Sequence, residues 1–95
     1  MRLMRLQPTL TLHTAEAALR QLRAEAASQP GAWAIDASAL VDFDSAALAL
    51  LLETRRLAQA AGRSFAVTGA PPKLIQLAQL YGVDGLLGLG YAADA

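Results

Sequence analysis

The feature that most constrains the fold is an unbroken apolar run, Ala46 to Leu52, placed directly after Asp44 and Ser45. Asp and Ser are favoured at helix starts because their side-chain oxygens accept hydrogen bonds from backbone N–H groups that lack a partner within the helix. The sequence therefore predicts a helix over residues 45–61. Its first half is apolar on all sides. We expect one side to pack on a sheet and the other to form an interface, since so small a chain has little left to cover it.

Asp44 and Ser45 also place a carboxylate and a hydroxyl at the positive end of this helix, just beyond a predicted buried strand at residues 33–37. That arrangement suits anion binding, a phosphate carried on the hydroxyl, or the docking of a partner. A simple helix cap, worth about 1 kcal/mol, is an equally good interpretation of the two residues taken alone.

Strands and helices are predicted to alternate along the rest of the chain. Residues 2–6 and 9–13 alternate in polarity, as strands do, and form either a hairpin or one interrupted strand. Helices are predicted at residues 15–27 and 73–81, with a strand at 64–68 between the second and third helices. Residues 83–90 give no clear assignment, and we expect residues 88–95 to form a loose tail. The order predicts a single domain over residues 1–95, an α/β sandwich with a mixed β-sheet.

Composition argues against several classes of function. The formal net charge is +0 and aromatic residues make up only 5%, which disfavours nucleic acid as a partner. The chain has no cysteine and no apolar run long enough to span a bilayer, so we expect neither thiolate metal sites nor membrane insertion. Residues 1–6 are too short for a signal peptide, which predicts that the protein stays in the compartment where it is made.

The sequence contains no complete catalytic or metal-binding motif. Asp42, Asp44 and Glu53 have the spacing of calcium ligands in an EF-hand, but Ala47 stands where that loop requires Gly. His13 is the single histidine, and no Gly-rich phosphate loop precedes a lysine. We therefore expect no catalytic residue, no metal site and no cofactor.

Two stretches resemble a known family. Residues 35–38 (Ile-Asp-Ala-Ser), followed by residues 41–48 (Val-Asp-Phe-Asp-Ser-Ala-Ala-Leu), are similar to the STAS domain, the fold of anti-sigma factor antagonists and of sulfate-transporter cytoplasmic tails. Residues 77–83 (Leu-Ala-Gln-Leu-Tyr-Gly-Val) look like the MlaB subfamily. The resemblance covers roughly residues 10–87. It implies a STAS-type sandwich, a mixed β-sheet with helices packed mainly on one face.

The resemblance also implies a function. The chain would be a non-catalytic cytoplasmic subunit of an Mla-type phospholipid ABC transporter, peripheral to the inner membrane through its complex, that helps to maintain outer-membrane lipid asymmetry. Its partners would be an MlaF-like ATPase and, in the same complex, an MlaE-like permease. Ser45 matches a Thr or Ser that grips the ATPase, and Tyr81 matches a tyrosine near the same contact surface. Around Ser45 the implied patch consists of Asp44, Ala46, Ala47 and Leu48.

The alternative is an anti-sigma factor antagonist controlled by serine phosphorylation. Members of that group usually carry Asp-Ser-Ser, with the second Ser as the phosphoacceptor, whereas this chain has Ala46 at that position. A phosphorylation switch would have to use Ser45. A helix N-terminus tolerates the phosphate charge, but that charge would disrupt an apolar docking patch.

Overall fold

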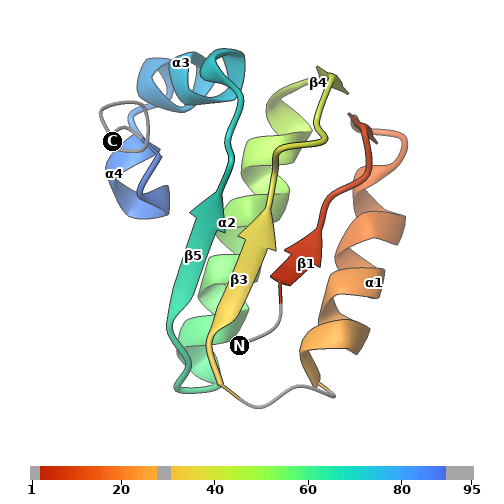
Figure 1. Cartoon of the computed structure of the whole chain (residues 1–95), viewed down its shortest axis with the longest axis vertical. Helices are drawn as coiled ribbons and strands as arrows, with labels where there is room; N and C mark the ends of the chain where they lie inside the picture. The colour runs from red at the N-terminus through yellow and green to blue at the C-terminus, as the bar shows by residue number, and fades with distance from the viewer. Residues whose placement is uncertain (1–2, 28–30, 90–95) are drawn as a thin grey trace.

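The computed structural model describes residues 3–27 and 31–89. Strands and helices alternate, so the predicted α/β class is confirmed (Figure 1). The strands are β1 (Leu3–Arg5), β2 (Thr9–Leu10), β3 (Trp33–Asp36), β4 (Asp42–Phe43) and β5 (Phe65–Thr68). The helices are α1 (Ala15–Ala27), α2 (Ser45–Ala60), α3 (Pro72–Leu80) and α4 (Asp84–Leu87).

All described strand pairs are parallel, whereas the sequence predicts a mixed sheet. Strands β1, β3 and β5 form one sheet in that order, and β2 pairs with β4 in a second sheet. A long crossover separates each pair of partner strands and returns the chain to the same end, which makes the pairing parallel. Because β1 and β2 lie in different sheets, the described residues of the two predicted strands, 3–6 and 9–13, form neither a hairpin nor one interrupted strand.

The two faces of the three-stranded sheet differ in what covers them. Met4 and Ile35 are register partners, and both are buried in the same core cluster as residues of α1 and α2. On the other face lie the register partners Arg5, Asp36 and Thr68. In Figure 1 α2 passes behind the sheet, and no described helix crosses the face turned toward the viewer. The helices therefore gather mainly on one face, as the sequence analysis expects.

Local signals account for the helix ends. The Asp44 carboxylate caps α2 by accepting a hydrogen bond from the backbone N–H of Ala46 at 2.8 Å. The helix stops at Ala60, and Gly62 follows with a positive φ of 71°, a conformation that glycine adopts without strain. Pro72 opens α3, where its missing N–H costs no hydrogen bond. These ends agree with the predicted ones to within one or two residues.

The C-terminal part is more ordered than the sequence predicts. Residues 83–90 had no assignment, and the structure places the short helix α4 there. Leu89, which falls in the predicted loose tail, is fully buried in the core. The tail prediction is therefore wrong for Leu89, and the rest of that tail, residues 90–95, lies outside the described residues.

A tight turn ends β3 beneath the start of α2. The Asp36 carboxylate accepts a hydrogen bond from the Ser38 backbone N–H at 2.9 Å and lies 3.6 Å from the Arg5 guanidinium. The Ser38 hydroxyl and N–H, with a smaller contribution from Arg5, hold the pKa of Asp36 below its usual value. Gly69 approaches this turn so closely that a Cβ there would lie 2.8 Å from the Ser38 Cβ.

The structure describes four helices within residues 3–27 and 31–89. Each of them is too short or too polar to cross a bilayer.

Candidate partner-binding site

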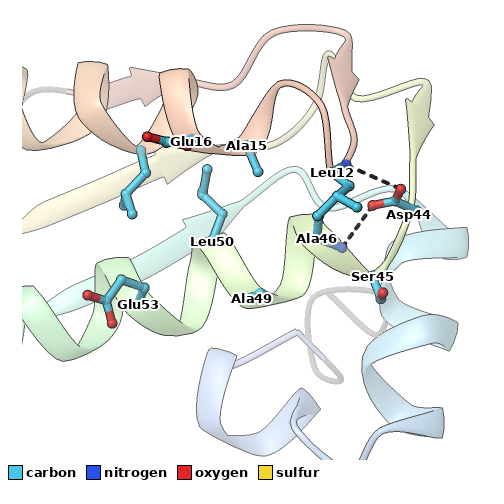
Figure 2. A pocket seen from close by; sticks show the side chains of 10 residues that line it. Leu12, Ala15, Glu16, Asp44, Ser45, Ala46, Ala49, Leu50 and Glu53 are labelled. Atoms are coloured by element: carbon cyan, nitrogen blue, oxygen red, sulfur yellow. Dashed lines mark hydrogen bonds between the residues drawn. The ribbon is translucent and has the colours of Figure 1, made fainter.

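The Asp44 side chain holds the starts of two helices together. One carboxylate oxygen caps α2 at Ala46, and the other accepts a hydrogen bond from the Leu12 backbone N–H at 3.3 Å (Figure 2). Leu12 lies in the turn that leads into α1. The sequence indicates the cap but not the bond to Leu12, because the two residues are far apart in the chain. Asp44 therefore has a structural role whether or not it contacts a partner.

Ser45 is exposed and borders three grooves. It is the first residue of α2, and Figure 2 shows its side chain pointing away from α1. The α1–α2 groove has a volume of 640 Å³, and Ser45 lies at one end of it. An α2–α3 groove of 430 Å³ lies on its other side, and a third groove of 270 Å³ runs along α2 to Val83. A bound partner would thus reach Ser45 from several directions.

The remaining helix-start residues are not equally accessible. Ala46 is half-buried, whereas Ala47 and Leu48 are 0% and 3% exposed. The expectation that α2 begins with an uncovered apolar side is wrong for most of this stretch. Helices α1 and α4 both pack against α2 and bury residues that the sheet does not cover. Ala47 and Leu48 therefore support Ser45 from beneath rather than offering surface of their own.

Tyr81 and Ser45 come together, although they are far apart in the sequence. Tyr81 follows α3, and both residues border the α2–α3 groove and the groove to Val83. The periodicity of α3 predicts Tyr81 on its apolar face with Leu74 and Ala78, which are fully buried, yet 58% of Tyr81 is exposed. Its place at the end of the helix, followed by Gly82 in a left-handed conformation, turns the ring away from the core.

Sequence reasoning missed two exposed leucines of this region. Leu80 is 79% exposed and lines the α2–α3 groove, and Leu12 is 76% exposed and lines the α1–α2 groove. The available signal for Leu80 was its place in α3 outside the face formed by Leu74, Leu77 and Ala78. Large apolar side chains exposed beside grooves are typical of docking surfaces.

The charges around Ser45 differ between the grooves. The α1–α2 groove is lined by the carboxylates of Glu16, Asp44 and Glu53, whereas the lining of the α2–α3 groove includes both Lys73 and Asp44. Arg56 donates two hydrogen bonds to Glu53, at 2.7 and 2.8 Å, and lowers the pKa of that carboxyl. Within the described part of the chain no cluster of three potential metal-binding side chains forms.

Comparison with known proteins gives one clear result. A search of curated proteins found no match. A family model described as "Mlab, STAS domain" matches residues 2–88, which is nearly the whole chain. This span contains the helix start at Ser45, the Tyr81 region and every described strand and helix. By this match, the chain belongs to the STAS domain family described by that model.

Proposed function

We propose that this protein is a non-catalytic STAS subunit of an Mla-type phospholipid ABC transporter, in which it binds and supports the ATPase subunit. STAS domains are generally binding modules without catalytic activity, and the matching family model carries the Mlab description. The observation that carries the proposal is the exposed groove shared by Ser45, Leu80 and Tyr81. In this role the protein would be cytoplasmic and held at the inner membrane through a complex with an MlaE-like permease.

The physical basis for docking is the mixture of side chains in the α2–α3 groove. Leu80 and Tyr81 expose large apolar areas, and burying such a side chain contributes about 1.5–3 kcal/mol. Tyrosine is enriched among the residues that contribute most to protein–protein binding. Ser45 is small, so a partner can approach the start of α2 closely. A stable interface of this kind buries about 1,200–2,000 Å² in total, so the partner must extend beyond the groove.

The test is co-expression with the MlaF-like ATPase and purification through a tag on this chain. Wild type is compared with Ser45→Arg and with the control Ser64→Arg, an exposed serine that precedes β5. We expect wild type and Ser64→Arg to retain the ATPase and Ser45→Arg to lose it, because a long cation at residue 45 fills the groove. Thermal melting of each variant alone should give the wild-type melting temperature, since both positions are exposed.

One outcome would overturn the transporter role, and another would overturn the expectation that Ser45 serves docking alone. A wild-type chain that does not retain the ATPase would contradict the transporter role. The exposed hydroxyl of Ser45 favours the anti-sigma factor antagonist as the next candidate, and phosphate incorporation at Ser45 by a candidate kinase would then decide. A Ser45→Arg variant that melts several degrees below Ser64→Arg would show that residue 45 contributes to folding, not only to docking.

A further inference from the structure

The α1–α2 groove is the largest of the grooves that Ser45 borders, and the docking surface at Tyr81 does not use it. Its walls are the starts of two helices that lie side by side (Figure 2). Figure 2 shows the Leu12 side chain reaching from the α1 side toward Ala46. The apolar residues that line the groove are Leu12, Ala15, Leu19, Ala46, Ala49 and Leu50.

The shape of the groove suits a helix. It runs along α2 from Asp44 to Glu53, a length of about 14 Å at 1.5 Å per residue, or about two and a half helical turns. Three alanines line it, so the backbone of a third helix can approach closely. A helix of this length places two or three apolar side chains, spaced three or four residues apart, on one face.

The charged side chains that line the groove indicate which kind of partner it can bind. Three carboxylates line it, those of Glu16, Asp44 and Glu53, and none of the lining residues is basic. Glu16 and Glu53 stand on opposite walls, and each pairs with an arginine of its own helix outside the lining. The Arg20–Glu16 pair is exposed and spans 3.4 Å, so a partner cation can compete for that carboxylate. The groove lining offers no Lys or Arg side chain to a lipid phosphate or to a nucleic-acid backbone.

We propose that the α1–α2 groove binds an amphipathic helix of the ATPase partner, with aliphatic side chains on the groove floor and Lys or Arg side chains beside Glu16 and Asp44. This inference rests on the proposed function, because it names a second contact with the same partner. The contact widens the docking surface from Tyr81 across Ser45 to Leu12. Such an extension supplies area that the α2–α3 groove alone does not offer.

Photocrosslinking from Leu12 in the co-purified complex tests the proposal. The photoreactive residue p-benzoylphenylalanine replaces Leu12 in one variant and Val41 in a matched control; these side chains are 76% and 78% exposed. We expect the Leu12 variant to crosslink to one ATPase segment with amphipathic helical spacing and Lys or Arg residues. The Val41 variant should not crosslink to that segment, because Val41 lies outside the groove lining.

The outcomes separate the two proposals. If the ATPase co-purifies but Leu12 crosslinks to nothing, to a second copy of this chain or to an ATPase segment without basic residues, the groove proposal is wrong and the proposed function stands. If the ATPase does not co-purify with the wild type, both are wrong. Binding of the free protein to phosphatidylglycerol vesicles that is lost in Leu12→Lys, but not in Val41→Lys, would make the groove a lipid site instead.

A binding measurement adds a second readout. Leu12→Lys places a cation at the mouth of the groove, where it repels the basic residues of the expected helix. We expect it to weaken binding of the ATPase about tenfold while Val41→Lys leaves it unchanged. Equal affinities for the two variants would overturn the proposal.

Discussion

At the end of the fold where β1, β3 and β5 finish, α2 begins (Figure 1). There the side chains of Leu12, Leu80 and Tyr81, which line the grooves around Ser45, are largely exposed. At the opposite end, where α1 and α2 finish, the described residues form a smaller groove. There Trp33 is only 8% exposed, and the Arg63 guanidinium donates a hydrogen bond to the Ala26 carbonyl at 3.0 Å. The groove at that end measures 250 Å³, against 640 Å³ between the starts of the same two helices.

The two ends of the fold differ in whether contacts within the chain cover their apolar side chains. Arg63 joins the end of α1 to the residues after α2, so that end is stabilised from within the chain. At the other end the Asp44 carboxylate joins the helix starts, but the apolar side chains around it have no cover within the described residues. Exposed apolar surface gathered at one end is the property expected of a binding module.

The largest expected loss of stability follows from truncating Leu48, and it tests whether this residue belongs to the core or to the exposed end. Leu48→Ala removes a side chain that is 3% exposed and should lower the free energy of unfolding by about 3 kcal/mol, since a cavity remains. Leu80→Ala, at a position 79% exposed, should change it by less than about 0.5 kcal/mol. Urea denaturation of both variants measures the difference. Similar losses of unfolding free energy in the two variants would contradict the assignment of Leu48 to the core and of Leu80 to the surface.

A smaller loss of stability is expected when either of two glycines, one from each end of the fold, is replaced by alanine. Both Gly69 and Gly62 have positive φ, so an added Cβ strains either backbone by about 1 kcal/mol. At Gly69 the Cβ would also collide with Ser38, whereas at Gly62 it meets open space. Gly69→Ala should therefore cost about 2 kcal/mol or more and Gly62→Ala about 1 kcal/mol. Thermal unfolding of the two variants measures both losses of stability. Equal losses would mean that the Ser38 turn shifts to accommodate the Cβ at residue 69 without loss of stability.

The smallest expected effect is a pH dependence of stability that comes from the Asp36 carboxylate, near the exposed end. Because hydrogen bonds from Ser38 and the nearby Arg5 lower the pKa of Asp36 in the folded state, this group stabilises the fold above its unfolded pKa, near 3.9. That contribution is lost as the pH falls through the lower, folded-state pKa. Wild type should thus lose more stability than Asp36→Asn when urea denaturation at pH 5 is repeated at pH 2.5. The Ser38→Ala variant should lose an intermediate amount of stability between the two pH values. Equal losses for all three proteins would contradict the link between the Asp36 pKa and stability.

Features that depend on neighbouring residues in the chain were predictable. The Asp44 cap, Gly62 after α2, Pro72 at the start of α3 and the span of α1 all follow from local backbone chemistry. The Glu16–Arg20 ion pair of α1 is likewise a consequence of helical spacing. Local signals of this kind need no knowledge of what packs against the element.

Features that depend on distant packing were not predictable in the same way. The uniform apolar pattern of α2 does not reveal that Leu48 is covered while Ala49 is exposed, because α1 and α4 decide this. Strands β2 and β4 have two residues each, too few for a periodic pattern. The site shows the same limit: Ser45 and Tyr81 came from the family resemblance, whereas the contribution of Leu12 depends on the Asp44 bond between the helix starts.

The parallel register has a consequence for folding kinetics. Leu3 pairs with Ala34, Trp33 with Phe65, and Thr9 with Asp42, so every described strand pair joins residues more than thirty positions apart. Each such loop costs about 3 kcal/mol of closure entropy before its first contact forms. We therefore expect α1 and α2 to form on a faster timescale than the sheet, and the folding rate to be limited by the search for strand partners. On a ribosome, no sheet pairing can begin until β3 has been synthesised.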